Sequence, residues 1–227
     1  MSTLNEYILL FDIDGVLAMD GDVNNQNLSE IISLHPNIVE VFQNITFPVA
    51  ILTHRSRREA EQILSALKIN RKKLVGCFTA QDLLSSALLK HQYRTLLKQG
   101  LKKSFILPLL EDKYGFKKEN IAMVDDRPEN LSVLMKSGVG LTMLAPHVVF
   151  RSENSVMSFD LEQVISIFKQ WVANHDQKTI TTALTNKQRY LGGWSQTGMD
   201  IEMMNKTFIY CRRAVRKVRK SIAQVIR

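Results

Sequence analysis

Tyr7-Ile8-Leu9-Leu10-Phe11-Asp12-Ile13-Asp14-Gly15-Val16-Leu17 is the stretch that decides the fold class. Its first five residues are apolar, an aspartate follows, a second aspartate comes two residues later, and Gly15 interrupts the pattern. Such an apolar run predicts a strand buried on both faces, and therefore a parallel sheet under helices. Ligands of these sheets bind beyond the carboxyl ends of the strands. Because buried carboxylates need partners, Asp12 and Asp14 at that position favour a hard cation with oxygen ligands.

The rest of the chain alternates predicted strands with predicted helices. Further strands are expected over residues 47–52, 73–78, 120–124 and 139–144. Helices are expected over residues 28–42, 56–67, 79–99, 104–114, 128–138 and 160–172. This alternation predicts an α/β fold with a doubly wound, Rossmann-like parallel sheet of about five strands. We expect this domain to occupy residues 1–175 and a small basic α-helical region to occupy residues 176–227.

Length and composition are those of one medium globular domain with a small appendage. The chain has 227 residues, of which 45% are hydrophobic and 23% charged, as in ordinary soluble proteins. No apolar run approaches the roughly eighteen residues of a membrane-spanning helix, and no secretory signal is visible at the N-terminus. The two cysteines, Cys77 and Cys211, make neither a disulfide framework nor a zinc site. We therefore expect a reducing, cytoplasmic compartment.

The net charge of +8 is concentrated near the C-terminus. From Lys178 onward the sequence holds eleven Lys or Arg residues against two acids, Asp200 and Glu202, whereas residues 1–177 are close to neutral. We therefore expect any acidic partner to bind the C-terminal region.

Three of the predicted buried strands end on residues that can take part in chemistry. They are followed by Asp12 with Asp14, by Thr53, and by the pair Asp125 and Asp126. Because the strand ends of a parallel sheet share one edge, we expect these residues to lie together although more than a hundred positions separate the first from the last.

The order of these residues resembles a known family. Asp12-Ile13-Asp14-Gly15, a hydrophobic strand ending in Thr53, a lysine, and then Val124-Asp125-Asp126 are similar to the four motifs of the haloacid dehalogenase superfamily of phosphatases. The resemblance covers about residues 5–145. It implies Mg²⁺-dependent hydrolysis of a phosphomonoester, in which catalysis is mostly positioning and charge neutralisation.

The resemblance also implies a role for each motif residue. Asp12 would be the nucleophile that forms an aspartyl phosphate, and Asp14 the general acid and then the base for the attacking water. Thr53 would donate its hydroxyl to a phosphoryl oxygen. Asp12, the main-chain carbonyl of Asp14 and Asp126 would hold Mg²⁺, and Asp125 would support that site through hydrogen bonds.

Two lysines compete for the third motif. Lys103 lies 23 residues before Asp126 and 12 before Gly115, which is similar to the spacing in the small magnesium-dependent phosphatases of the superfamily. We therefore predict Lys103 as the catalytic lysine that screens the phosphoryl charge, with Lys102 as the alternative. His54 and Arg55 follow Thr53 and could face the substrate.

Neither gap between the motifs leaves room for a large cap domain. Fewer than forty residues separate Asp14 from Thr53, and about fifty separate Thr53 from Lys103. Caps exclude water and select small metabolites, so an open site favours a phosphate presented on a macromolecule. Compact members of the superfamily include protein tyrosine phosphatases, and this resemblance favours a phosphotyrosine protein as substrate.

The C-terminal region is predicted to end in a helix over residues 203–226. An apolar stripe runs along it at spacings of three and four, formed by Met204, Phe208, Cys211, Val215, Val218, Ile222 and Val225. The remaining faces carry Arg212, Arg213, Arg216, Lys217, Arg219 and Lys220. Three interpretations stay open: a helix packed on the domain with a solvated basic face, binding to an anionic phosphoinositide membrane at about 1 kcal/mol per basic residue, and binding to nucleic acid.

A phosphatase with a basic helical C-terminus also resembles bacterial effector proteins that act inside host cells and dock on phosphoinositide membranes. The function predicted from the sequence is thus a Mg²⁺-dependent phosphotyrosine protein phosphatase docked at anionic membranes. One alternative is a polynucleotide end phosphatase with a nucleic-acid-binding tail. A second is a catalytically inactive phosphatase fold that serves as a lipid- or protein-binding module.

Overall fold

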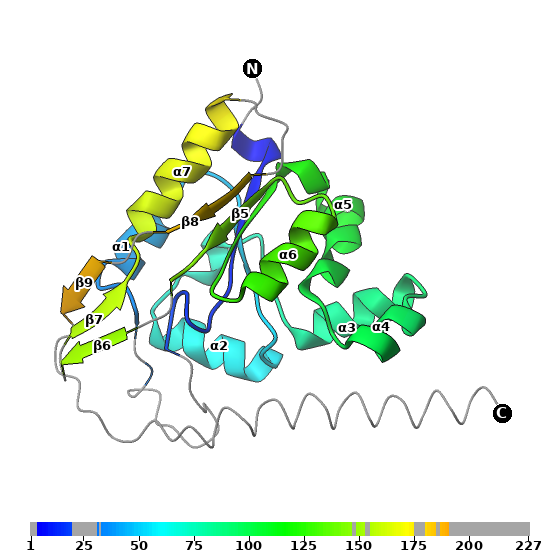
Figure 1. The fold of residues 1–227 in the computed structure, drawn as a ribbon, viewed down its shortest axis with the longest axis horizontal. Coiled ribbons are helices and arrows are strands. Elements are labelled where there is room, and N and C mark those ends of the chain that lie inside the picture. Colours follow the sequence, from blue (N-terminus) through cyan, green and yellow to red (C-terminus); the bar gives the residue numbers. More distant parts are fainter. Residues whose placement is uncertain are drawn as a thin grey trace.

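A six-stranded parallel sheet forms the centre of the molecule. The computed structural model describes residues 4–19, 31, 33–146, 149–152, 155–174, 180–184 and 187–190. Within them the strand order is β3-β2-β1-β4-β5-β8, and every neighbouring pair is parallel (Figure 1). The strands are β1 (Ile8–Phe11), β2 (Val49–Leu52), β3 (Gly76–Phe78), β4 (Ile121–Asp125), β5 (Leu141–Leu144) and β8 (Ile180–Ala183).

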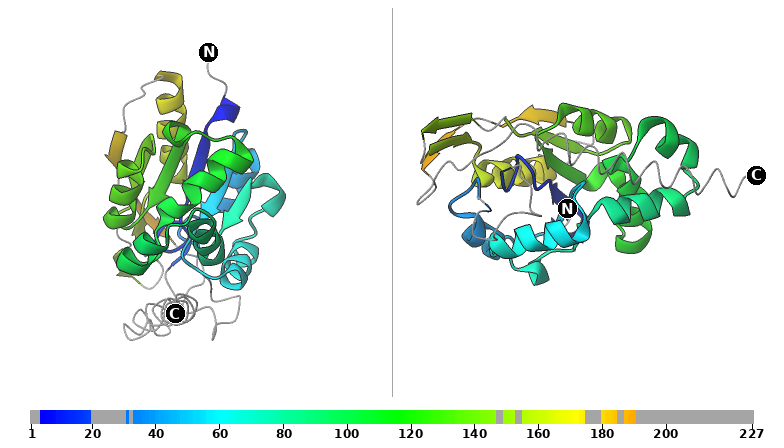
Figure 2. Two further views of the ribbon diagram at one scale, coloured as in Figure 1. Left: turned by 90° about the vertical axis from the view of Figure 1, so that its right-hand side faces the viewer. Right: turned by 90° about the horizontal axis from the view of Figure 1, so that it is seen from below.

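Helices cover both faces of this sheet, as the doubly wound prediction requires (Figure 2). On one face the core includes residues of α1 (Ile38–Asn44), α2 (Arg57–Ala66) and α7 (Leu161–Asn174). On the other it includes residues of α3 (Ala80–Leu89), α4 (Tyr93–Gln99), α5 (Leu107–Tyr114) and α6 (Pro128–Lys136). The fully buried β1 divides between the two faces, with Leu9 and Phe11 in the first core and Ile8 and Leu10 in the second. Each such side chain contributes about 1.5–3 kcal/mol by leaving water.

The sheet extends past the expected domain end at residue 175. β8 pairs with β5 in the register Leu141↔Ile180 and forms an edge of the sheet. A second sheet of order β6-β7-β9 is antiparallel and consists of β6 (Val149–Ser152), β7 (Ser155–Ser158) and β9 (Lys187–Tyr190). The short sequence of β8, Ile-Thr-Thr-Ala, has no apolar run, so nothing in it resembles the buried strands.

Three predicted helices differ from the observed elements. The helix expected over residues 28–42 begins only at Ile38, as α1, because residues 33–37, which include Pro36, are not helical. The helix expected over residues 79–99 is divided into α3 and α4, and His91 between them has a left-handed φ of +54°. The helix expected over residues 104–114 opens with a 3₁₀ turn, Lys103–Ile106, before α5. The predicted C-terminal helix, with its six basic residues, lies outside the described residues.

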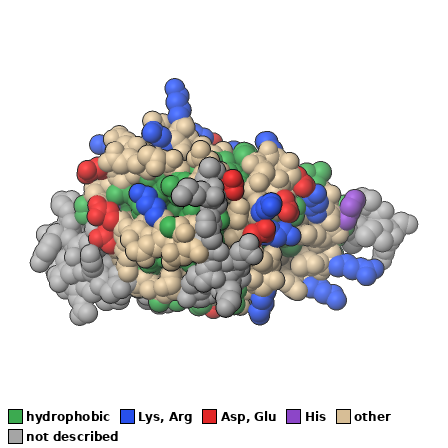
Figure 3. Space-filling view, turned by 90° about the horizontal axis from the view of Figure 1, so that it is seen from above, with side chains coloured by type: hydrophobic (Ala, Val, Ile, Leu, Met, Phe, Trp, Pro, Cys, Tyr) green, Lys and Arg blue, Asp and Glu red, His purple; other side chains and the backbone are tan. Residues whose placement is uncertain are grey.

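None of the helices in the described ranges is long and apolar enough to span a bilayer. Seen from above, basic and acidic side chains are interspersed over the described surface (Figure 3), in keeping with the near-neutral balance of residues 1–177.

Candidate active site

The sheet order brings the predicted motif residues to one edge. β1 lies between β2 and β4, so Asp12 after β1 neighbours both Thr53 after β2 and Asp125 at the end of β4. The Asp12 amide continues the ladder by donating to the Val124 carbonyl at 3.0 Å. The central strand and its two neighbours thus place chemistry-bearing side chains side by side.

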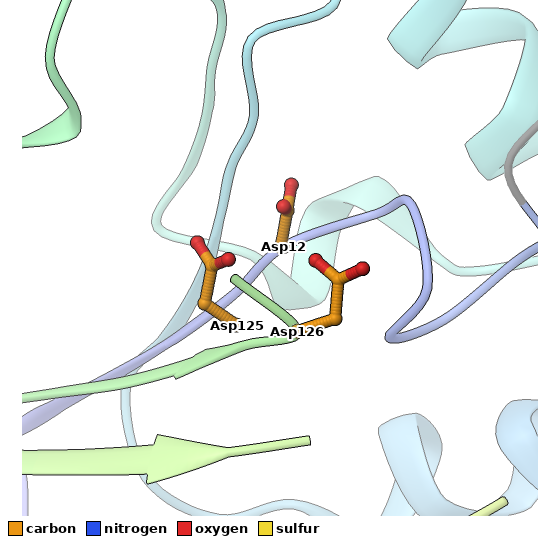
Figure 4. A group of neighbouring side chains, drawn as sticks. All are labelled: Asp12, Asp125 and Asp126. Atoms are coloured by element: carbon orange, nitrogen blue, oxygen red, sulfur yellow. The ribbon is translucent and has the colours of Figure 1, made fainter. Parts of the chain in front are cut away.

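Three carboxyl groups meet at the ends of β1 and β4 (Figure 4). One oxygen each of Asp12, Asp125 and Asp126 lies within 4.8 Å of the other two, a grouping that can hold a metal ion. Asp12 and Asp125 are buried, and Asp126 is partly buried. Oxygen donors of this kind suit a hard divalent cation.

Lys103 is the lysine that reaches this cluster. Its side chain is 1% exposed, and its Nζ lies 2.6 Å from Asp12 Oδ2 and 2.6 Å from Asp125 Oδ2. It opens the 3₁₀ turn Lys103–Ile106, which precedes α5. Phe105 and Ile106 of this turn are buried in the core. Lys102, the alternative, is partly exposed and makes no ion pair among the described residues.

The cluster contains more carboxyl groups than ammonium groups, and burial makes their ionisation unfavourable. Burial raises the pKa of Asp12 and of Asp125, against the opposing effect of the Lys103 ammonium. Burial, together with the neighbouring Asp12 and Asp125, raises the pKa of Asp126 to about 7. Burial alone would lower the pKa of Lys103, but the two carboxylates outweigh it and the pKa is raised. One ammonium faces three carboxyl groups, so a bound cation would stabilise the ionised cluster.

Asp126 and Gly15 provide the test of whether a cation fits. Asp126 Oδ1 is buried and has no hydrogen-bond partner among the described residues. Gly15 has a φ of +69°, and a Cβ at this position would lie 2.4 Å from Asp126 Oδ2. The turn after β1 therefore approaches this carboxylate as closely as only glycine allows. The unpaired oxygen and the close approach are consistent with a cation site.

Asp125 is held by several donors at once. Its Oδ1 accepts the Arg127 amide at 2.9 Å, and Asn130 Nδ2 lies 3.1 Å from Oδ1 and 3.0 Å from Oδ2. With Lys103 on Oδ2, this carboxylate is occupied by protein donors. These contacts hold Asp125 in a position from which it can orient Lys103, which in turn contacts Asp12. Asn130 could not be identified from the sequence, because an asparagine in the first turn of a helix carries no signal of its own.

Thr53 lies in the turn that joins β2 to α2. It is buried, and its Oγ1 accepts the Arg55 amide at 3.2 Å. Because Oγ1 acts as the acceptor in this contact, the hydroxyl proton can be donated to another group. His54, between them, has its pKa lowered to about 4 by burial and by the Lys103 ammonium, so it is neutral at neutral pH.

Arg55 is buried and contacts Asp14. Its Nε lies 2.9 Å from both carboxylate oxygens of Asp14, and one terminal nitrogen lies 2.7 Å from Oδ1. The second terminal nitrogen is 3.7 Å from Glu59 Oε1. The sequence placed Arg55 near the substrate but contained no sign of its pairing with Asp14. A capping box formed by Ser56 and Glu59 is present at the start of α2.

The six predicted anion-binding residues lie outside the described residues, and their role stays a prediction. They are Arg212, Arg213, Arg216, Lys217, Arg219 and Lys220.

No protein-family model matches the sequence, and neither does any curated protein. Similar solved structures include a haloacid dehalogenase-like family hydrolase from Streptococcus pneumoniae, with 10% identity and a TM-score of 0.43, over 61% of this chain and 83% of that one. Another is 3-deoxy-D-manno-octulosonate 8-phosphate phosphatase from Moraxella catarrhalis, in complex with magnesium, phosphate and KDO, with 16% identity and a TM-score of 0.36, over 62% of this chain and 69% of that one.

A third similar structure is the N-terminal part of a Bacteroides fragilis protein that contains a phosphatase domain complexed with Mg. It has 13% identity and a TM-score of 0.39, and the match covers 60% of this chain and 34% of that one. Similarities of this size do not assign the chain to a family.

Proposed function

We propose that this protein is a Mg²⁺-dependent phosphomonoester hydrolase that works through a phosphorylated Asp12. The observation that carries the proposal is the Asp12 carboxylate at the end of the central strand, buried between Lys103 and the carboxyl groups of Asp125 and Asp126. A buried carboxylate beside both an ammonium and a candidate cation site is what in-line attack on a phosphate dianion requires.

The first half of the reaction transfers the phosphoryl group to the protein. An Asp12 oxygen attacks phosphorus, the ester P–O bond breaks, and the leaving oxygen takes a proton from Asp14. Thr53 donates its hydroxyl to a phosphoryl oxygen, and the Lys103 ammonium balances the charge gathered around Asp12. In the second half, water attacks phosphorus, Asp14 accepts its proton, and Asp12 is released.

The cation belongs to this proposal through the residues that would hold it. Asp12, Asp126 and the main-chain carbonyl of Asp14 are the ligands that we propose, with Asp125 as their hydrogen-bonded support. When bound, Mg²⁺ would neutralise the carboxylates and the phosphoryl oxygens and so allow a dianion to approach.

The test is hydrolysis of a small aryl phosphate by wild type and by Asp12→Asn, each with Mg²⁺ and with chelator. We expect turnover that needs both Mg²⁺ and Asp12, because the amide of asparagine is no nucleophile. Asp112→Asn is the matched control, since Asp112 pairs with Lys90 at the surface and is not part of the carboxyl cluster. Turnover that persists in Asp12→Asn would exclude Asp12 as the nucleophile.

We further propose that the substrate phosphate is carried by a macromolecule, specifically a phosphotyrosine protein. The support is that residues 53–103 form α2, α3 and α4, which contribute to the two cores, and β3, which belongs to the sheet. Little of this part of the chain is left to build a large cap. Phosphotyrosine peptide, phosphoserine peptide and 3′-phosphorylated DNA should be compared at equal concentration. We expect the tyrosyl peptide to have the highest kcat/KM, and preference for the DNA would instead favour the polynucleotide end phosphatase.

We also propose that the basic residues 212–220 dock the protein on anionic membranes. The support is six Lys or Arg residues among nine positions that contain no acid. Cosedimentation with phosphoinositide-containing and neutral vesicles should show binding to the former only, weakened by salt. Equal binding to both vesicles would contradict the proposal, and salt-sensitive binding to oligonucleotides alone would reassign the region to nucleic acid.

A further inference from the structure

The proposed reaction gives no role to the contact between Arg55 and Asp14. The guanidinium donates to both oxygens of Asp14 at 2.7–2.9 Å. The side chain of Arg55 is 3% exposed and that of Asp14 is 20% exposed. Charge-assisted contacts of this fork geometry hold a carboxylate in one orientation.

Arg55 is itself anchored from several directions. Its amide donates to Thr53 Oγ1 at 3.2 Å, and its carbonyl accepts the amide of Ala80, the first residue of α3, at 3.0 Å. Its guanidinium also reaches Glu59 Oε1 at 3.7 Å, and Glu59 is fixed by the capping box at the start of α2. The guanidinium that contacts Asp14 therefore extends from a backbone that is tied to both α2 and α3.

From this geometry we infer that Arg55 is a positioning residue, which aims the Asp14 side chain for hydrolysis of the phosphorylated enzyme. The inference rests on the proposed function, because it assigns a partner to the base of that reaction. It is tested in the second half of the reaction, in which Asp14 acts as the base for the attacking water.

The step that depends on this orientation is the attack of water on phospho-Asp12. The water oxygen forms a bond to phosphorus, and its proton passes to a carboxylate oxygen of Asp14. The bond between phosphorus and the Asp12 oxygen breaks, its electron pair returns to Asp12, and inorganic phosphate leaves. An Asp14 that turns away from the water slows this step, because the geometry of a reacting pair can change a rate by about a hundredfold.

The first half of the reaction, phosphorylation of Asp12, should depend less on Arg55 when the substrate is an activated aryl phosphate. Its leaving phenolate needs little help from an acid, so Asp12 can still be phosphorylated. Loss of Arg55 should therefore make the phosphorylated enzyme accumulate, because it slows the second half of the reaction more than the first.

The experiment uses the full chain and 2,4-dinitrophenyl phosphate with Mg²⁺, for wild type, Arg55→Gln and Arg55→Lys. Rapid acid quench and mass spectrometry measure the fraction of protein that carries one phosphoryl group at steady state. We expect Arg55→Gln to lose about tenfold to a hundredfold in turnover while its phosphorylated fraction rises above that of wild type. The turnover and the phosphorylated fraction of Arg55→Lys should lie between those of wild type and Arg55→Gln, since lysine keeps the positive charge but lacks the forked guanidinium group.

Two further variants keep the test decisive. Arg58→Gln makes the same change at an exposed position of α2 and should behave as wild type. Glu59→Gln removes the anion beside Arg55 but retains a residue that can complete the capping box, and it should show the same effect in smaller measure. If Arg55→Gln does not fold, the turnover and the phosphorylated fraction of Glu59→Gln test the inference in its place.

The result that overturns the inference is a phosphorylated fraction that falls together with turnover, or a turnover that does not change. Either would mean that Arg55 acts in folding, acts in binding the substrate, or has no part in the reaction. A wild type that neither turns over nor becomes phosphorylated contradicts the proposed function instead, so the two failures are distinguished.

Discussion

A single ammonium group lies between two buried carboxylates at the end of the central strand. Lys103 contacts Asp12 and Asp125 at 2.6 Å each, and the third carboxyl group, that of Asp126, has a buried oxygen without a protein donor among the described residues. Burying charge is unfavourable unless it is paired. The buried carboxyl groups therefore destabilise the folded protein electrostatically. Binding of a divalent cation together with a phosphate would offset this destabilisation.

This cost predicts how stability depends on pH. Because the pKa of Asp126 is raised from its ordinary value of 3.8 to about 7, the native protein holds a proton that the unfolded chain has already lost between these values. Stability from this group is thus fully present below about pH 4 and is lost as pH rises through about 7. Asp126→Asn removes the dependence, so the variant should gain stability relative to wild type as pH rises from 4 to 8.

Urea unfolding at several pH values in chelator measures this difference. Mg²⁺ added at pH 8 should stabilise wild type and have much less effect on Asp126→Asn, because the cation takes the place of the proton. A difference between the two proteins that stays constant over this pH range would show that Asp126 is not the group responsible.

At the scale of elements, short turns after the strands set the geometry of the site. The turn after β1 is closed by hydrogen bonds from the amides of Val16, Leu17 and Ala18 to the Ile13 carbonyl at 2.9–3.3 Å. It carries Asp14 and Gly15 past the end of β4. The turn after β2 carries Thr53 and Arg55 and is fixed by the N-terminus of α2. These two turns set the contacts of Asp14, Thr53 and Arg55, whereas Asp125 is placed by β4 itself and Lys103 by the 3₁₀ turn before α5.

Gly15, in the turn after β1, and Gly115, after α5, both have a positive φ. Comparing their alanine variants therefore distinguishes the cost of a left-handed backbone from the cost of steric crowding by Asp126. Gly15 and Gly115 have φ values of +69° and +76°, but a Cβ would meet Asp126 only at Gly15 and nothing within 4 Å at Gly115. Gly115→Ala should cost about 1–2 kcal/mol through the left-handed backbone alone. Gly15→Ala should cost more and should also weaken Mg²⁺ binding by about tenfold or more, since Asp126 must move.

Titration calorimetry with Mg²⁺ and urea unfolding of both variants provide the measurements. Equal Mg²⁺ affinity in Gly15→Ala and wild type would mean that Asp126 does not hold the cation. Gly115→Ala should leave the affinity unchanged, because it ends α5 away from the carboxyl cluster.

Element boundaries were predicted well where the pattern was strong and poorly where tertiary contacts decide. The apolar runs of β1, β2 and β4 were found, because full burial leaves an uninterrupted hydrophobic sequence. The break between α3 and α4 was not, because Lys90, His91 and Gln92 contain neither glycine nor proline. The helix C-terminus there is made by His91 in a left-handed conformation, which local sequence seldom reveals.

At the scale of the whole molecule, the parallel sheet closes with a strand from beyond the expected domain boundary. β8 pairs with β5, and Leu184 directly after it is buried and donates its amide to the Leu144 carbonyl at 3.0 Å. The fold therefore uses chain that composition alone would assign to the C-terminal region.

Truncation tests this extension of the domain. A chain that ends at residue 175 lacks β8 and Leu184 and should be less stable than a chain that ends at residue 190, by about 2 kcal/mol or more, since burial of Leu184 alone contributes about 1.5–3 kcal/mol. Urea unfolding of the two fragments provides the comparison. Equal stability would show that the domain ends before β8.

The sequence by itself determined that Asp12, Thr53 and Asp125 follow buried strands and that these strands share an edge, because uninterrupted apolar runs must be buried and parallel strands align their carboxyl ends. Only the tertiary structure decided that Lys103 rather than Lys102 enters the cluster, that Arg55 holds Asp14, and that β8 completes the sheet. These outcomes depend on the direction of side chains and the pairing of distant segments, which are set by the packing of the whole molecule and not by the residues next to them in the chain.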